Sequence, residues 1–359
     1  MKLSGADLLC ELSNINGPSG YEADVAGFVA EQLGDISDVS FDNLGSVICA
    51  QAGGAERPRV MLAAHTDEIG FMVKQVTAEG YLRMSPLGGW WDQVLLAQQM
   101  TVLGSKGPVL GIIASKAPHL LDDEERNKLV KKQDMFLDIG ARNREQAMEK
   151  FGVVPGDAVV PTTKAQRMAD PDMLMGKAWD DRAGVAAMIE ALRELAQLEH
   201  PNTVYGVGTA QEEVGLRGAQ TAAQTIAPDV ALVLEVAICG DVPGVKESES
   251  EVKLGGGPTI YIFEGSAIPN LRLRDLAKET CKELGFECQF SALERGGTDA
   301  GKIHVHAGGV PSIVLAVPAR HIHAHTGIIE LNDYTQTVQL TVELTRKLDA
   351  ATVDSLRPH

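Results

Sequence analysis

Residues 59–67 read RVMLAAHTD, a short apolar run that ends at a histidine and an aspartate. A continuous apolar run of this length is typical of a strand that is buried on both faces, as in a parallel or mixed sheet. Polar residues that follow such a strand lie at its carboxyl end, where open α/β sheets bind their ligands. The stretch therefore predicts both an α/β fold and the place of a functional site.

The rest of the chain supports this class of fold. The N-terminal 33 residues predict two helices joined by a Gly/Pro/Ser loop, followed by a strand at 46–50. Further strands are expected at 204–209, 230–236, 286–293 and 310–317, and helices at 183–198, 271–284 and 332–348. Strands that alternate with helices predict a mixed central sheet with helices on both faces.

One segment of the chain has a different pattern of apolar and polar residues. Between residues 71 and 161, short alternating runs such as FMVKQV and VLGIIAS are separated by Gly and Pro, with one helix-prone insertion at 120–133. Such runs are typical of a small all-β module. We therefore expect an α/β domain made of residues 1–67 and 162–359, with a β-barrel-like domain of residues 68–161 inserted into it.

Composition excludes several classes of partner. The 359 residues carry a net charge of -17, which opposes binding to nucleic acid and to anionic membranes. The five cysteines form no CxxC pair, which fits a reducing compartment. No signal peptide and no apolar stretch of about 20 residues is present, so a cytoplasmic location is expected.

Histidines and carboxylates follow several of the expected strands. They are His65 and Asp67, Glu212 and Glu213, Glu235 and His323, while Asp180 opens an expected helix. Each alone has an ordinary interpretation, such as a helix cap for Asp180 or a solvated pair for Glu212 and Glu213. Their convergence on one sheet edge favours a common site instead.

This set of side chains suits a pair of divalent cations. Imidazole and carboxylate ligands are typical of Zn²⁺ and of neighbouring transition metals, and an Asp can bridge two ions ~3.5–4 Å apart. Asp67 lies two residues after His65, so its carboxylate is placed to accept the second ring N–H of that histidine. Glu212 and Glu213 can divide metal binding and proton transfer between them.

Six motifs extend these observations to a known family. In chain order they are AHTDEIGFMV from residue 64, GKAWDDRAG from 176, TAQEEVGLRGA from 209, GDVPG from 240, GGTDA from 296 and RHIHAH from 320. In order and spacing the chain resembles the tetrahedral (glutamyl-type) aminopeptidases, dinuclear metallo-aminopeptidases whose members are also labelled cellulases or endoglucanases. The resemblance runs from the GPSGYE loop at residue 17 to the last helix.

The resemblance implies two metal sites that share one bridging ligand, Asp180. The sites consist of His65, Asp180 and Glu235, and of Asp180, Glu213 and His323. It further implies that Glu212 is the general base and that Asp67 orients His65. The resemblance also implies a zinc-peptidase-like architecture for the α/β domain and a role in dimerisation for residues 68–161. The chain is expected to form a homo-oligomer, a hollow tetrahedral dodecamer built from dimers.

The expected function is that of a metal-dependent aminopeptidase. It would hydrolyse the N-terminal peptide bond of short peptides through a metal-bridging water activated by Glu212, with two divalent ions, zinc first and cobalt or manganese as alternatives. A metal-dependent deacylase or carboxypeptidase on the same core and a non-catalytic scaffold are the other candidates. A glycosidase is disfavoured, because aromatic residues, the usual sugar platforms, make up only 4% of the chain.

The chain departs from the family pattern in four ways. Glu235 stands where many members have Asp, Trp90 and Trp91 replace a single Trp, His321 stands where Tyr is common, and His325 replaces a frequent Pro. The spacing favours His323 over His325 as the ligand.

Three further polar residues stay open in the sequence. His304 and His306 alternate in IHVHA and are expected on one face of a strand, in a packed or surface role. Asp299 supports either the site or a subunit contact. The preferred N-terminal residue of the substrate is not readable from the sequence.

Overall fold

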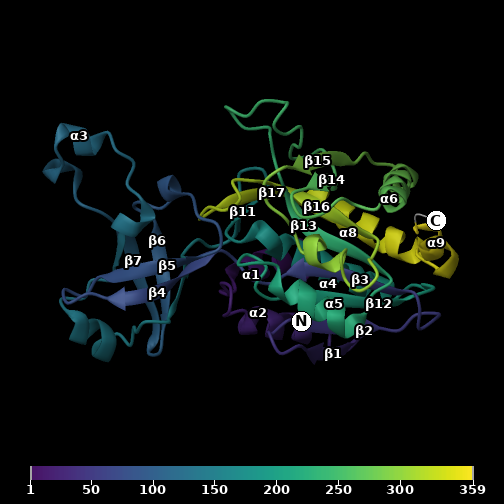
Figure 1. The fold of residues 1–359 in the computed structure, drawn as a ribbon, viewed down its shortest axis with the longest axis horizontal. Helices are drawn as coiled ribbons and strands as arrows, with labels where there is room; N and C mark the ends of the chain where they lie inside the picture. Colours follow the sequence, from purple (N-terminus) through teal and green to yellow (C-terminus); the bar gives the residue numbers. More distant parts are fainter. Residues whose placement is uncertain (1, 358–359) are drawn as a thin grey trace.

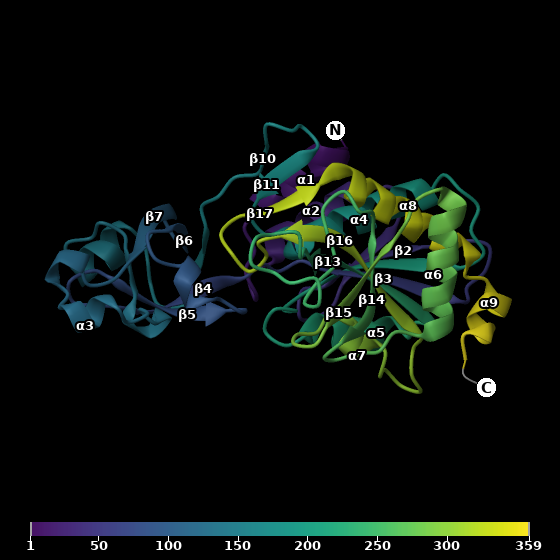
Figure 2. The ribbon, with the colours of Figure 1, turned by 90° about the horizontal axis from the view of Figure 1, so that it is seen from above.

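The computed structural model describes residues 2–357. Figures 1 and 2 both show a small β-barrel beside a larger α/β body. The body contains an 11-stranded sheet, and the barrel is closed. A mixed α/β fold with a small all-β insertion, as predicted, is confirmed.

Four parallel strands form the centre of the sheet, in the order β12-β3-β13-β16. Their bounds are β3 Arg59–His65, β12 Thr203–Thr209, β13 Val230–Ile238 and β16 Ser312–Arg320. The register pairs Thr209 with His65, so β3 and β12 end side by side. Polar residues at or just beyond these ends therefore share one edge of the sheet.

The flanks of the sheet include antiparallel strands. They are β1 Asp38–Phe41 and β2 Val47–Gln51 on one side, and β17 Gly327–Glu330, β11 Met173–Gly176 and β10 Gln166–Arg167 on the other, while β14 Thr259–Glu264 pairs with β16 and with β15 Gln289–Leu293. The strand expected from residue 286 begins later, because Gly285 ends the preceding helix at a φ of 83° and the chain needs a turn before it re-enters the sheet.

Helices cover both faces of the sheet (Figure 2). One face carries α1 Gly5–Asn14, α2 Ala23–Leu33, α4 Trp179–Leu195, α6 Leu271–Leu284 and α8 Leu331–Lys347. The other carries α5 Arg217–Ile226 and α7 Ala300–Ile303, and α9 Ala350–Ser355 lies near the C-terminus. Val60 and Leu62 of β3 pack into the first core while Met61 and Ala63 pack into the second. Burial of both sets explains why the run is continuously apolar.

The barrel follows the order β4-β5-β8-β7-β6-β9. Its strands are β4 Gly70–Val76, β5 Leu82–Leu87, β6 Gln99–Gly104, β7 Gly107–Ala114, β8 Phe136–Asp138 and β9 Ala158–Pro161. The helix-prone insertion forms one short helix, α3 Asp123–Arg126. The chain enters the barrel just after His65, so barrel and sheet edge are neighbours.

The prediction of a strand at His304 and His306 was wrong. Helix α7 ends at Ile303, and His304 continues into a turn in which its N–H donates to Ala300 O at 3.0 Å. The alternation of two histidines therefore carries no strand signal here. Among residues 2–357, no helix has the length and apolarity needed to cross a membrane.

Candidate metal centre

The sheet edge brings together residues from five elements. His65 is the last residue of β3, Glu212 and Glu213 lie in the turn after β12, and Glu235 lies inside β13. His323 follows β16, and Asp180 lies at the start of α4. All five predicted metal ligands, although they span residues 65–323, meet in one region.

These side chains form two groups whose ligand atoms lie within 4.8 Å of one another: His65, Asp180 and Glu235, and Asp180, Glu213 and His323. In the first group His65 Nε2 lies 3.0 Å from Asp180 Oδ1 and 3.6 Å from Glu235 Oε1. In the second, His323 Nε2 lies 3.3 Å from Asp180 Oδ2 and 3.7 Å from Glu213 Oε1. Asp180 therefore offers one carboxylate oxygen to each group.

The start of α4 explains how two adjacent aspartates serve different purposes. Asp180 and Asp181 have non-helical backbone angles, so the regular helix begins after them. Asp181 Oδ1 accepts the N–H of Gly184 at 3.0 Å, which is a helix cap, and Asp181 Oδ2 accepts the N–H of His65 at 3.1 Å. The capping role therefore belongs to Asp181, which leaves Asp180 directed at the two histidines.

Asp67 has more contacts than the sequence indicates. The His65 Nδ1 atom lies 3.0 Å from the backbone oxygen of Asp67 and 3.4 Å from its carboxylate. The carboxylate accepts the N–H groups of Glu212 at 2.9 Å and Glu213 at 3.1 Å, and the hydroxyl of Ser19 at 2.6 Å. Asp67 therefore fixes the turn that carries both glutamates, and its backbone is the nearer partner of the His65 ring.

The barrel segment also reaches the site. His323 has a φ of 53°, an uncommon conformation for a residue with a side chain, and its Nδ1 hydrogen-bonds to Gly89 O at 2.6 Å. A Cβ on Gly89 would lie 3.1 Å from that ring nitrogen, and one on Gly88 would lie 3.1 Å from Glu213 Oε2. Glycines at 88 and 89 thus allow the loop to approach the cluster closely.

Burial and mutual repulsion alter the pKa values of the carboxylates. Burial, aided by the charge of Asp180, raises the pKa of Glu213 to about 8. Burial also raises the pKa values of Glu235 and Glu212 well above their usual range, with further contributions from neighbouring carboxylates. The cluster therefore contains more carboxyl groups than the neighbouring cationic side chains can neutralise if all of the carboxyls are ionised.

The neighbouring carboxylates raise the pKa values of both histidines. Burial alone would lower the pKa of His323, but the hydrogen bond to Asp180 and the charge of Glu213 raise it to about 10. The pKa of His65 is likewise raised well above its usual value by Glu212, Asp180 and Asp67, against the effect of burial. Strongly perturbed groups gathered in one place are characteristic of functional sites.

The cluster fits divalent cations. Glu213 Oε1 is buried and has no hydrogen-bond partner among the described residues. A buried oxygen of this kind is costly unless a cation or a donor reaches it. Imidazole nitrogens and carboxylate oxygens are the donor set that zinc and its neighbours prefer.

A buried ion pair behind the site was missed by the sequence reasoning. Lys177 Nζ donates to both oxygens of Glu68, at 2.6 and 2.8 Å, and to Asn16 Oδ1 at 2.9 Å. Arg182 lies 3.8 Å from Glu68 and donates to Thr66 O at 2.9 Å. The motifs AHTDE and GKAWDDR contain these residues, so the signal was present, but their pairing required the three-dimensional fold.

The structure places the remaining open residues. Trp90 is buried, stacks on Phe71 with 5.2 Å between ring centroids, and donates to Gly70 O at 2.9 Å, whereas Trp91 is 61% exposed. His325 is buried with its Nε2 3.2 Å from Met100 Sδ, so it packs against the barrel. Asp299 is buried and accepts the hydroxyl of Thr209, which places it beneath the end of β12 and not on an outer surface.

A small cavity adjoins the cluster, and His321 is among the residues that line it. Its lining combines Asp180, Glu213 and His323 with the apolar side chains of Ile69, Trp179 and Ile322. The cavity places apolar surface next to the candidate metal ligands.

Two solved structures with this fold are described as peptidases. The TET aminopeptidase of the marine sediment archaeon Thaumarchaeota archaeon SCGC AB-539-E09 superposes with a TM-score of 0.95 at 46% identity, covering 98% of both chains. The TET1 peptidase of Pyrococcus horikoshii, which can assemble into a tetrahedron or a large octahedral shell, superposes with a TM-score of 0.86 at 31% identity, covering 95% of this chain and 99% of that one. The fold is therefore that of an aminopeptidase, and its candidate ligands are of the types that bind divalent cations.

Sequence comparison identifies the family. The model of the M42 glutamyl aminopeptidase family matches residues 45–340, a span that includes every candidate ligand. The putative aminopeptidase FrvX of Escherichia coli is 38% identical over 330 residues, or 91% of each chain. The chain belongs to the M42 glutamyl aminopeptidase family and is a peptidase, which confirms the predicted class of enzyme.

Proposed function

We propose that this aminopeptidase uses two divalent cations, one held by His65, Asp180 and Glu235 and the other by Asp180, Glu213 and His323. The observation that carries the proposal is the pair of three-residue groups that share the two oxygens of Asp180. Zinc is the expected ion, with cobalt or manganese as alternatives. Short peptides with a free N-terminus are the proposed substrates, and the cytoplasm is the proposed location.

Glu212 is the proposed general base. Its Oε2 lies 3.9 Å from His65 Nε2, its side chain is buried, and its backbone is held by Asp67. Glu212 takes a proton from the attacking water and passes it to the leaving amine. Bound divalent cations supply Lewis acidity for the scissile carbonyl and a lowered pKa for the water.

The proposal is tested with a panel of aminoacyl chromogenic substrates and matched N-acetylated peptides. Activity on free N-termini should disappear with a chelator and return when zinc, cobalt or manganese is added. Acetylated peptides should remain uncut throughout. Hydrolysis of acetylated peptides at comparable rates would instead assign the chain to the deacylase or carboxypeptidase alternative.

Metal binding at pH 7 is expected to release protons. Glu213, with a pKa of about 8, and His323, with a pKa of about 10, are largely protonated at pH 7 in the absence of a cation. Both must lose a proton to become ligands, so affinity should rise as the pH increases from 6 to 8. Calorimetric titration of zinc into metal-free protein, in buffers of different ionisation enthalpy, measures the number released. Proton uptake, or an affinity that falls with pH, would contradict the assignment.

Removing a ligand of one group should remove one cation. The His323→Ala variant loses a ligand of the second group only, and Glu235→Ala one of the first only, so elemental analysis should show the metal content falling from two ions per chain to about one in each case. His321→Ala is the matched control, because this neighbouring residue belongs to neither group. Full metal content in both ligand variants would contradict the proposed sites.

We also propose that the barrel mediates homo-oligomer assembly, with dimers built into a dodecamer. Its strand β7 exposes Leu110 (58%) and Ile112 (43%). Elsewhere in the inserted residues 68–161, Trp91, Leu120 and Leu129 are also exposed. Apolar surface of this kind marks interaction sites. Light scattering should show a lower molecular mass for Leu110→Asp/Ile112→Asp, while Val305→Asp, at an exposed position of the body, keeps the native mass.

A further inference from the structure

An acidic groove lies at the other end of the sheet, away from the candidate metal centre. It has a volume of about 1010 Å³ and is formed by residues 34–38, 50–54 and 195–201. These segments follow the C-termini of α2 and α4, run beside the end of β2 and precede β12. The candidate ligands follow the opposite ends of the parallel strands, so the groove is a separate site.

The charge of the groove favours a cation. Its lining includes the carboxylates of Asp35, Asp38 and Glu199, and the described residues that line it include neither Lys nor Arg. Asp35 is paired with Lys2, whereas Asp38 and Glu199 have exposed side chains outside the ion pairs found among residues 2–357. The C-terminal ends of two helices add partial negative charge.

A buried amide supplies an independent sign of a ligand. Gln51 is only 5% exposed, and its Nε2 donates to Leu192 O at 3.0 Å and Ile36 O at 3.3 Å. These two contacts fix the orientation of the amide, because a reversed amide would set its oxygen against two carbonyls. Gln51 Oε1 is then left without a hydrogen-bond partner in the described part of the chain.

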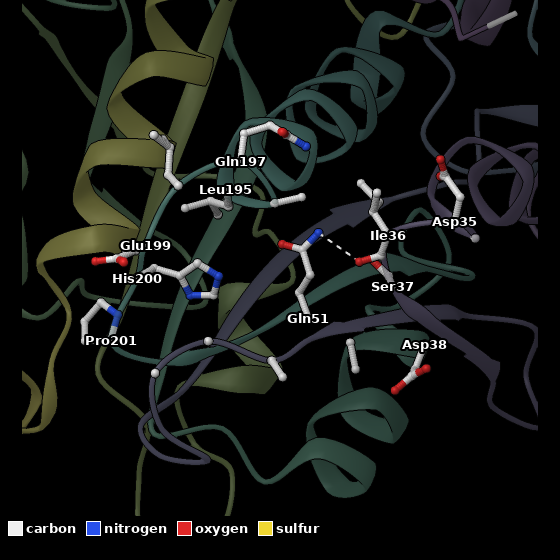
Figure 3. Close-up of a pocket in the computed structure, with 17 residues that line it drawn as sticks. Asp35, Ile36, Ser37, Asp38, Gln51, Leu195, Gln197, Glu199, His200 and Pro201 are labelled. Carbon is white, nitrogen blue, oxygen red and sulfur yellow. Dashed lines mark hydrogen bonds between the residues drawn. The ribbon is translucent and has the colours of Figure 1, made fainter.

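Figure 3 shows where this oxygen points. The amide oxygen of Gln51 is directed away from Ile36, into the groove on the side of His200 and Leu195. Ser37 Oγ, in the same lining, is also buried without a partner among residues 2–357. The Gln51 oxygen can only accept a hydrogen bond, so in this acidic groove it calls for an N–H donor rather than for an anion or an apolar group.

The arrangement favours an organic polycation over a metal ion. In Figure 3, Asp38 lies at one end of the groove, Glu199 lies at the other and Gln51 lies between them. The groups of His, Cys, Asp and Glu suited to a metal within residues 2–357 include neither Asp38 nor Glu199. A linear compound with several ammonium groups can meet both ends and donate a hydrogen bond in the middle.

We propose that this groove binds a free polyamine. Ammonium groups at the ends of the ligand pair with Asp38 and Glu199, and an internal N–H group donates a hydrogen bond to Gln51 Oε1. Simultaneous contact at both ends makes a polyamine a better ligand than a monoamine of the same chemistry. The site is independent of the catalytic chemistry, so its occupancy is measured by binding.

The test is calorimetric titration of spermidine into the full-length, metal-loaded enzyme, with n-butylamine as the single-ammonium comparison. Spermidine should bind saturably, with one site per chain, and more tightly than n-butylamine. The Asp38→Asn/Glu199→Gln variant should weaken spermidine binding about 3- to 10-fold, the effect expected of two exposed charge pairs. Glu247→Gln/Glu279→Gln, which removes two exposed carboxylates elsewhere, should leave it unchanged.

A second variant addresses the buried amide. Gln51→Met keeps the length of the side chain and removes the unpartnered oxygen together with the N–H donors to Leu192 O and Ile36 O. It should weaken spermidine binding while circular dichroism stays native. Equal weakening in the groove variant and the Glu247/Glu279 control would show that spermidine only screens the acidic surface, and would overturn the proposal. Tighter binding of an N-acetylated trilysine amide than of spermidine would overturn the choice of a free polyamine as the ligand.

Discussion

The Glu212→Gln variant is expected to keep both cations and to lose about 10²- to 10⁴-fold in kcat, the usual contribution of a positioned acid–base group. Glutamine keeps the size of the side chain and the backbone hydrogen bond from Glu212 to Asp67, but it cannot take a proton. The loss should appear in kcat more than in KM, because the group acts on the reacting water. Steady-state kinetics on an aminoacyl chromogenic substrate, with metal content measured on the same sample, provide the test.

The neighbouring residue supplies the control for this prediction. Glu213→Gln changes the same chemical group one position along the chain, yet it should lower metal content because Glu213 belongs to the second ligand group. The two variants thus separate proton transfer from metal binding. Near-native turnover in Glu212→Gln would show that another group accepts the proton.

Lys177→Met is expected to destabilise the protein by about 3–5 kcal/mol, the usual effect of removing one partner of a buried ion pair. Lys177 and Glu68 are each 1% exposed, and the substitution leaves the Glu68 carboxylate buried with Arg182 3.8 Å away as the remaining cation. The free energy of unfolding, measured by denaturant titration at a fixed zinc concentration, gives the magnitude. Because Glu68 immediately follows Asp67, metal affinity should fall as well.

A double replacement distinguishes an unpaired charge from lost packing. Glu68→Met/Lys177→Met removes both charges, and it should be less destabilising than Lys177→Met alone. If the double variant is as unstable as the sum of the single variants, the buried charge is not the cause. In that case the lost hydrogen bonds to Gly17 and Asn16 would explain the effect.

The sequence predicted the fold well wherever the apolar pattern was long. The helix expected at 271–284 matches α6, Leu271–Leu284, and the apolar run at 59–64 became the central strand β3. The five candidate ligands came from the family motifs, and the fold brings them together because parallel strands carry their carboxyl ends to a common edge. Their binding of metal stays a prediction. The short strands β1, β10 and β17 were not predicted, since two to four residues give too little periodicity.

Other features depend on distant contacts that no local pattern contains. The turn of Glu212 is held by Asp67, which is 145 residues earlier, and Lys177 meets Glu68 across 109 residues. The acidic groove combines three segments that are each unremarkable as sequence. Such contacts become visible only when the chain is folded, although the residue types that make them are present in the motifs.

The hydrogen bond between His323 and Gly89 connects the α/β body to the inserted barrel segment. The imidazole is steered by a carbonyl that belongs to the inserted barrel, 234 positions away in the chain. A shift of the barrel relative to the body would therefore move the hydrogen-bond acceptor of a candidate metal ligand. If the proposed barrel interface fixes the position of the barrel, assembly also fixes the acceptor that orients the His323 ring.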